Sequence, residues 1–311
     1  MKIAENSEWQ GSMPGTPGLM ARLNTGFASA ARFLGLAQAR CFHCLRPFTP
    51  CKETSASLPD STAAPDISGP LAPLCPQCRI LLAPHAGPRC PLCGLPSAPS
   101  PDADALPYAQ KGSRCGHCLT NPPPWSGAAF HGLYKAALRH VLLRLKFDGH
   151  LYLAPLLGAF LQEAARCLPR PDALVAVPQY PAHLRHRGYN QAHELARAVN
   201  AQTGFELAPD LLHRTRPGPA QIGLSARARP DNVRHSFASS SKVRDCRLWL
   251  VDDVMTTGST LRAASLALLD AGAARVDILV VARTTKDPAA PWASHQADPA
   301  HQAALEDESY I

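Results

Sequence analysis

Two adjacent aspartates, Asp252 and Asp253, are the residues whose chemistry is most easily tied to a ligand. They follow a run of large apolar side chains at 248–251, which is typical of a parallel strand buried on both faces. A turn rich in hydroxyl groups comes next, made up of Thr256, Thr257, Gly258, Ser259 and Thr260. We therefore expect a buried strand to place two carboxylates beside the start of a helix.

The turn at 256–260 has the composition of a phosphate-binding loop. Its backbone amides, with the dipole of the following helix behind them, can bind a phosphate dianion, and Gly258 lets the backbone approach closely. The two aspartates suit the hydroxyls of a sugar diol, so a sugar 5-phosphate is the simplest ligand. The competing interpretation is a capped helix beside two solvated aspartates, and the combination of acids with the Thr, Gly and Ser residues counts against it.

Eight of the 11 cysteines form four pairs with the spacing Cys-x-x-Cys. The pairs are Cys41 with Cys44, Cys75 with Cys78, Cys90 with Cys93, and Cys115 with Cys118. Two such pairs complete a tetrahedral zinc site that leaves no position open for water. The sequence therefore predicts two structural zinc ions rather than redox disulfides. We favour one site from the first two pairs and one from the last two, but spacing alone also allows the two central pairs to share an ion.

Patterning divides the chain into four blocks. Residues 1–40 form a leader with an amphipathic segment, in which Met20 is an alternative start to Met1. Residues 41–121 hold the cysteine pairs among Pro-, Ser- and Ala-rich spacers, and we expect them to form a double zinc ribbon. Residues 125–284 alternate short apolar runs with helical patterns, which indicates an α/β domain around a parallel sheet. Residues 285–311 lack a pattern to bury and are expected to be disordered.

Several elements of the α/β domain can be predicted individually. The apolar run at 173–177 and the largely apolar segment at 276–282 are typical of buried strands. Asn190 is suited to cap a helix whose apolar face includes Leu195 and Val199. Gly272 is suited to end the helix that follows the phosphate-binding turn.

Composition excludes some classes of protein. Of the 311 residues, 46% are hydrophobic, so the chain can bury a core, and no apolar run approaches the ~20 residues that span a bilayer. The net charge of +7, supplied mostly by arginine, favours an anionic partner. An odd number of cysteines in repeated pairs does not fit a secreted disulfide framework, so we expect a cytoplasmic protein.

From about residue 41 to 283 the sequence resembles the ComF family, which is competence-associated and similar to type I phosphoribosyltransferases, with an N-terminal double zinc ribbon. The acidic turn and the four cysteine pairs carry the resemblance. Further similarity lies at 115–125, 145–149, 185–191 and 221–232, with Tyr189 where the family usually has Phe.

The resemblance implies a type I phosphoribosyltransferase-like fold, a parallel sheet with helices on both faces. It also implies that the chain binds phosphoribosyl pyrophosphate (PRPP) with magnesium. Asp252 and Asp253 would contact the ribose hydroxyls, and residues 256–260 the 5-phosphate. The loop at 183–188, with Arg185, Arg187 and Gly188, would face the pyrophosphate, and the loop at 214–234 would close over the site.

Two functions follow from the resemblance. The first is a transferase that displaces pyrophosphate from C1 of PRPP, linked to competence and to DNA uptake or utilisation. The alternative is a non-catalytic factor that keeps the fold and binds single-stranded DNA through arginines at the open end of the sheet. For either function, the resemblance implies the competence DNA-uptake machinery as a partner.

Overall fold

The computed structural model describes residues 39–49, 73–98, 112–215 and 236–285. The amphipathic segment of the leader, residues 286–311 of the tail, and all of the 214–234 loop except its first two residues lie outside the described residues. Within the described part, no helix is long and apolar enough to cross a membrane.

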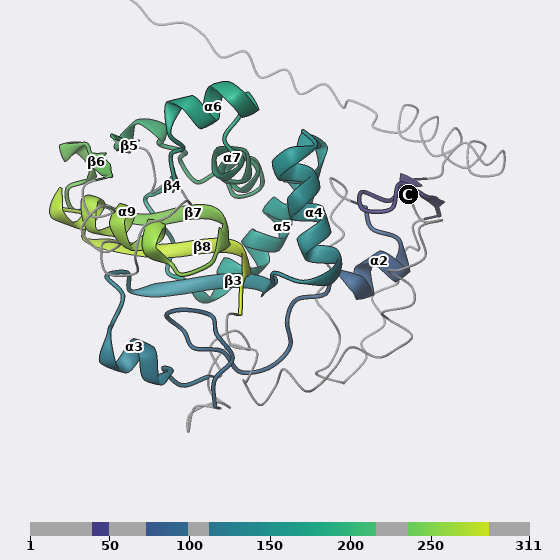
Figure 1. Ribbon diagram of the computed structural model, residues 1–311, viewed down its shortest axis with the longest axis horizontal. Helices are drawn as coiled ribbons and strands as arrows, with labels where there is room; N and C mark the ends of the chain where they lie inside the picture. Colours follow the sequence, from purple (N-terminus) through teal and green to yellow (C-terminus); the bar gives the residue numbers. More distant parts are fainter. Residues whose placement is uncertain (1–38, 50–72, 99–111, 216–235, 286–311) are drawn as a thin grey trace, which may run out of the picture.

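The centre of the fold is a four-stranded sheet in the order β3–β8–β7–β4 (Figure 1). Its strands are β3 (Gly127–Leu133), β4 (Ala173–Ala176), β7 (Arg247–Met255) and β8 (Arg275–Arg283). Every pairing in this sheet is parallel, so the carboxyl ends of the strands lie along one edge. Ligands of open parallel sheets bind at this edge.

Helices cover both faces of the sheet, as the sequence predicts (Figure 1). On one face, α5 (Ala154–Ala164) packs on β3 and β8, and α7 (Gln191–Thr203) packs on β4 and β7. On the other face lies α9 (Ser259–Asp270), next to the antiparallel pair β5 (Leu212–Arg214) and β6 (Phe237–Ser239). The remaining helices of this part are α4 (Ala136–Phe147) and α6 (Pro181–Arg187), with 3-10 turns at Leu151–Leu153, Ala165–Cys167, Pro209–Leu211 and Ser241–Val243.

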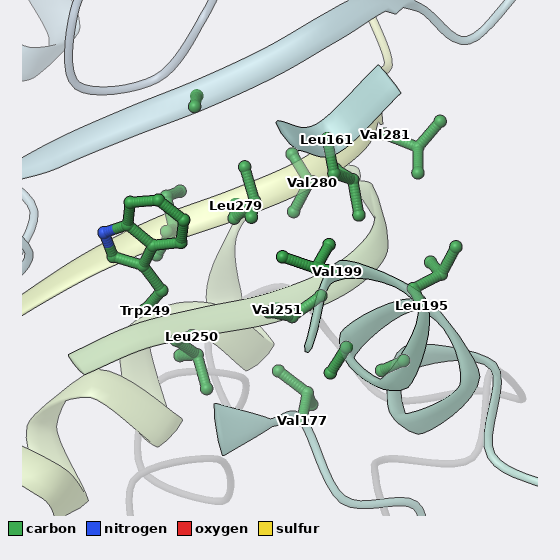
Figure 2. Close-up of a cluster of buried hydrophobic side chains, with 14 of the residues drawn as sticks. Leu161, Val177, Leu195, Val199, Trp249, Leu250, Val251, Leu279, Val280 and Val281 are labelled. Carbon is green, nitrogen blue, oxygen red and sulfur yellow. The ribbon is translucent and has the colours of Figure 1, made fainter. Parts of the chain in front are cut away.

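Local sequence explains how α7 is set against the sheet. Asn190 caps the helix, because its Oδ1 accepts a hydrogen bond of 3.1 Å from the backbone amide of Ala192. Figure 2 shows Leu195 and Val199 of α7 beside Val251 of β7. All three side chains are fully buried, and each contributes about 1.5–3 kcal/mol to stability.

Three elements differ from the sequence-based expectations. The apolar run at 248–251 does not end its strand at the aspartates: β7 continues to Met255, because β8 pairs with it along its whole length. The expected loop at 183–188 is mostly the helix α6, which ends at Gly188 with φ 83°. The edge strand β3 was not predicted, because its Gly- and Ala-rich sequence has little strand propensity.

The cysteine-bearing segments contain only short elements. They are β1 (Ala39–Arg40), β2 (Pro47–Phe48), α2 (Pro76–Leu81) and α3 (Gly116–Thr120). The helices α2 and α3 begin directly after Cys75 and Cys115, the first cysteines of their pairs. Figure 1 shows α2 and α3 well apart, at the right and the lower left of the view.

Candidate functional site

The two aspartates lie near the carboxyl end of β7, at the edge where ligands of such sheets bind. Both are half-buried. Asp252 Oδ1 accepts a hydrogen bond of 2.9 Å from the amide of Asp253, and Asp253 Oδ1 accepts one of 2.8 Å from the amide of Val254. The ammonium group of Lys146, from the last turn of α4, lies 3.9 Å from Asp253 Oδ2. A basic residue distant in the sequence therefore joins the acidic pair.

The electrostatics of the pair favour a ligand that donates hydrogen bonds. Burial and the adjacent charge of Asp253 raise the pKa of Asp252 well above its ordinary value, while Lys146 acts in the opposite direction. Arg214 on β5 also feels the charge of Asp252, although burial lowers the pKa of this arginine overall. Hydroxyl donors or a cation would stabilise the ionised form of such a pair.

The turn between β7 and α9 has the geometry of an anion site. Gly258 has φ 78°, and a Cβ at this position would lie 2.6 Å from Met255 Cε and 3.5 Å from the Trp125 ring. Thr257 and Ser259 are exposed, and their hydroxyl oxygens lie 3.0 Å apart at the start of the 12-residue helix α9. Free amides at the start of a helix and nearby hydroxyls can bind a phosphate group.

The segment around α6 reaches the same edge through contacts with α4. The hydroxyl of Tyr189 donates a hydrogen bond to the carbonyl of Leu145. The guanidinium of Arg187 lies 5.4 Å from the centre of the Phe147 ring, and Lys146 Nζ lies 5.7 Å from it. Arg187 and Lys146 therefore lie around the same Phe147 ring, while Arg185 is exposed on α6.

The first two cysteine pairs form one cluster, which we call the first cluster: Cys41, Cys44, Cys75 and Cys78. Their sulfur atoms all lie within 4.8 Å of one another, with Cys44 and Cys75 3.9 Å apart. Arg144 of α4 donates a hydrogen bond of 2.8 Å to the carbonyl of His43, between the cysteines of the first pair, and one of 2.7 Å to the Tyr152 hydroxyl. The first cluster is thus attached to α4.

The last two pairs form the second cluster: Cys90, Cys93, Cys115 and Cys118. Its sulfur atoms also lie within 4.8 Å of one another, with Cys93 and Cys115 3.6 Å apart. The favoured pairing is confirmed, and the two central pairs do not share a site. The second cluster packs on β3 and Trp125: the Trp125 indole donates a hydrogen bond of 2.6 Å to the carbonyl of Leu92.

Both clusters fit zinc. A Zn–S distance of about 2.3 Å in a tetrahedron places sulfur atoms about 3.8 Å apart, close to the observed separations. Hydrogen bonds from Cys78 and from Cys93 lower the pKa values of Cys41 and Cys90 to about 4. Burial raises the pKa of Cys118 to about 12, so full ionisation of the second cluster requires a cation at its centre.

Sequence reasoning gave no role to several residues that the structure brings to the site. Lys146 and Phe147 lie in the 145–149 segment, which is similar to the ComF family, so a signal was present. Trp125 ends another such segment. Arg283 shows no local signal, because it acts through contacts with distant parts of the chain, described below.

No family model matches the chain. It is 34% identical over 201 residues to the DNA utilization protein YhgH of Salmonella typhi, an alignment that covers 63% of this chain and 84% of the relative. Competence protein F of Haemophilus influenzae is 32% identical over 185 residues, covering 57% of this chain and 80% of the relative. Competence protein ComFC of Streptococcus pneumoniae is 29% identical over 150 residues, covering 48% and 65%.

Solved structures give more distant matches. The glutamine PRPP amidotransferase of B. subtilis, solved with ADP and GMP, is 23% identical with a TM-score of 0.30, over 42% of this chain and 26% of that one. The protein TT1426 of Thermus thermophilus is 20% identical with a TM-score of 0.28, over 44% of this chain and 86% of that one.

The sequence relatives match this chain over most of their own length, and the parallel sheet and two four-cysteine clusters are those expected from the motifs. The chain belongs to the ComF family of competence and DNA utilisation proteins.

Proposed function

We propose that this protein binds PRPP with magnesium and acts as a phosphoribosyltransferase in competence or DNA utilisation. The observation that carries the proposal is the acidic pair on β7, followed by a phosphate-type loop at the start of α9. The names of the relatives YhgH and Competence protein F support the biological setting.

Each part of PRPP has a counterpart at the sheet edge. Asp252 and Asp253 accept hydrogen bonds from the ribose hydroxyls, and the amides and hydroxyls of Thr256, Thr257, Gly258, Ser259 and Thr260 bind the 5-phosphate. Arg187 and Gly188 at the end of α6 face the pyrophosphate, with Arg185 as a further cation. Magnesium bound to the pyrophosphate supplies a Lewis acid.

In the transfer reaction, a nucleophile forms a bond to C1 of the ribose while the bond from C1 to the pyrophosphate oxygen breaks. The electron pair of that bond leaves with the pyrophosphate. Fixed positive charge on Arg185 and Arg187 stabilises the growing negative charge of the leaving group. The acidic pair beside the ribose stabilises positive charge that develops on the sugar.

Calorimetry with magnesium and PRPP tests the binding site. An Asp252→Asn/Asp253→Asn double variant should lose tenfold or more in affinity, because charge-assisted hydrogen bonds contribute about 1.5–3 kcal/mol each. Asp270→Asn, an exposed change at the far end of α9, is the matched control. Unchanged affinity in the double variant would rule out this diol site. Release of pyrophosphate from labelled PRPP with candidate bases or single-stranded DNA would identify the acceptor.

A second function, binding of single-stranded DNA, is favoured by Phe147. Its side chain is 65% exposed. Phe147 lies nine residues after the buried Leu138, which at about 100° per residue places it on roughly the opposite side of α4 from the packed face. An open ring beside Arg187 and Lys146 combines a stacking surface with cations, which is how proteins bind single strands without sequence preference.

An abasic oligonucleotide separates stacking from charge. Phe147→Leu should weaken binding of a normal single strand about fivefold to a hundredfold, because stacking contributes about 1–3 kcal/mol per base. The same variant should leave binding of the abasic strand unchanged. Leu119→Ala, at a position 64% exposed on α3, is the control. Equal binding of the normal single strand by Phe147→Leu and by the unmodified protein would exclude Phe147 as a stacking surface.

We further propose that the clusters bind structural zinc, that residues 41–121 and 125–284 are separate modules, and that the protein is cytoplasmic. Cysteines that gather as four-sulfur metal sites rather than as disulfides fit a reducing compartment. Metal analysis of protein purified without added zinc should find close to two ions per chain. A folded, metal-free preparation would contradict this.

A further inference from the structure

One buried arginine connects the second cluster to the phosphate loop. Arg283 is the last residue of β8 and is 8% exposed. Its Nε donates a hydrogen bond of 2.9 Å to the carbonyl of Cys93, a residue of the second cluster. Its Nη1 donates one of 3.0 Å to the carbonyl of Met255 and another to the carbonyl of Thr256, at the start of the phosphate loop. The same guanidinium group therefore touches both sites.

The contact with the loop fixes the direction of its amides. In a planar trans peptide, the carbonyl of one residue and the amide of the next point in opposite directions. Because the Thr256 carbonyl accepts a hydrogen bond from Arg283, the amide of Thr257 points away from Arg283. Arg283 thus orients an amide that the proposed phosphate site uses.

The contact with the second cluster explains how a cation is tolerated there. Burial lowers the pKa of Arg283, and the charges of Cys93, Cys118 and Cys115 raise it. A zinc ion bound by four thiolates carries net negative charge, so the loaded cluster stabilises the guanidinium. A planar guanidinium with several fixed donors also suits a position where two backbone segments must be held together.

Trp125 makes a second contact between the same two regions. Its indole is bonded to the Leu92 carbonyl, and its ring lies 3.5 Å from the place that a Cβ on Gly258 would occupy. The Pro91 carbonyl also accepts a hydrogen bond of 3.0 Å from the amide of Ala128 on β3. The segment between Cys90 and Cys93 is therefore held against both the sheet and the loop.

We propose that Arg283 is a positioning residue that couples zinc binding at the second cluster to phosphate binding by the loop. The proposal rests on the proposed function for the identity of the loop's ligand. Zinc in the second cluster holds the loop amides in their binding orientation, and a phosphate bound by the loop holds Arg283 and the cluster in turn. Coupling between two sites is reciprocal, so each ligand strengthens the binding of the other by the same factor.

Zinc release to a chromophoric chelator measures the coupling on the full chain. With ribose 5-phosphate present, release from the second cluster should slow about fivefold or more, the range of typical coupling. A Cys78→Ser variant, which disables the first cluster, assigns the release phase to the second. Ribose at the same concentration should give no protection, because it lacks the phosphate.

Arg283→Met should abolish this protection, and Arg283→Lys should restore part of it, because lysine keeps the charge but not the planar fork. Arg144→Met, an equivalent change beside the first cluster, should leave the protection intact. Protection that survives in Arg283→Met, or that is absent in the unmodified protein although calorimetry shows ribose 5-phosphate bound, would overturn the coupling.

Amide hydrogen exchange tests the coupling without any phosphate ligand. It can therefore be used even if Arg283→Met folds poorly. Removal of zinc from the second cluster by Cys118→Ser should speed amide exchange at residues 256–260 about fivefold or more, whereas Cys78→Ser should not. Unchanged exchange in Cys118→Ser would overturn the coupling. A failure of PRPP or ribose 5-phosphate to bind the unmodified protein, with this exchange result intact, would instead refute the proposed ligand and leave the coupling standing.

Discussion

The two cysteine clusters have the same ligands and nearly the same sulfur geometry, yet they are attached to different parts of the site. The first cluster is tied to α4 through Arg144, which is half-buried. The second is tied to the phosphate loop through Arg283, which is almost fully buried. The first cluster therefore supports the helix that carries Lys146 and Phe147, and the second supports the backbone of the loop itself. Motif identity does not determine how much a metal site contributes to function; its neighbours do.

Loss of zinc from the second cluster is expected to have the largest effect. Cys90→Ser and Cys41→Ser each remove a ligand from one cluster, and each variant should retain one zinc ion instead of two. A structural zinc contributes on the order of 10 kcal/mol to folding of small modules. Because the second cluster contacts the loop through Arg283, we expect Cys90→Ser to reduce PRPP affinity by about 5–150-fold and Cys41→Ser by a smaller factor.

Metal analysis and calorimetry on the same preparations check this comparison. Cys246→Ser, which changes a half-buried thiol outside both clusters, is the control and should retain both ions and full affinity. Equal losses of PRPP affinity in Cys41→Ser and Cys90→Ser would show that the two clusters do not differ in the way proposed.

Arg283 and Arg144 should also differ in how much they stabilise the protein, with Arg283 contributing more. This difference is smaller than the effect of losing a zinc ion. Arg283→Met takes the guanidinium donor from the buried Cys93 carbonyl and from the carbonyls of Met255 and Thr284, which costs about 3 kcal/mol in the free energy of unfolding. Arg144→Met should cost about 1 kcal/mol, because water can reach the acceptors of a half-buried side chain. Denaturant unfolding with zinc present measures both values, and a larger loss in Arg144→Met would reverse the order.

Sequence reasoning predicted what depends on local pattern. The cysteine spacing indicated two four-cysteine clusters, the apolar runs indicated the strands at 173–177, 248–251 and 276–282, and Asn190 indicated the start of α7. These features are confirmed, because each is determined by residues close together in the chain. The acidic pair and the loop were also predicted from one segment, and they lie near the end of β7 and the start of α9 as expected.

Contacts between distant segments were not predictable in this way. The bonds from Arg283 to Cys93 and from Trp125 to Leu92 join residues 190 and 33 positions apart. The approach of Lys146 to Asp253 likewise joins α4 to β7, two elements far apart in the sequence. The extension of β7 through the aspartates follows from pairing with β8, which a single apolar run does not reveal.

A difference between the two clusters lies in the residue after the second cysteine of their first pairs. Leu45 and Gly94 both have left-handed backbone, with φ 60° and 68°. The Leu45 side chain is 45% exposed, whereas a Cβ at Gly94 would overlap the Phe130 ring. Leu45→Gly should stabilise the protein by up to about 1 kcal/mol, because glycine adopts this conformation without strain. Gly94→Ala should destabilise it by about 2 kcal/mol, through strain and overpacking.

Thermal unfolding of zinc-saturated protein measures both changes. The two positions can be compared directly because their turns are alike: the amides of Leu45 and Gly94 each donate a hydrogen bond of 2.9 Å to the carbonyl of the first cysteine of the pair. If Gly94→Ala were as well tolerated as Leu45→Gly, the second cluster would not be packed tightly against β3.

The last prediction concerns the acidic pair, which lies near Lys146 of α4, the helix attached to the first cluster. The pKa of Asp252 is raised by burial and by Asp253 and lowered by Lys146 of α4, with Arg214 also nearby. The folded protein therefore keeps a proton on Asp252 that the unfolded chain, with an ordinary pKa of 3.8, has already released. Stability from this group is fully present below pH 3.8 and is lost as the pH rises through the raised pKa. The loss amounts to about 1.4 kcal/mol for each pH unit that separates the folded and unfolded pKa values.

Asp252→Asn removes this loss, so the ligand-free variant should gain stability relative to the unmodified protein as the pH rises, and the difference should level off above the raised pKa. Lys146→Met should move that plateau to higher pH, since it removes the cation that lowers the pKa of Asp252. Denaturant unfolding between pH 4 and 8 measures the effect. If the difference in unfolding free energy between Asp252→Asn and the unmodified protein were constant across this range, Asp252 would titrate normally. The helix α4, held by the first cluster, would then not influence the charge of the site.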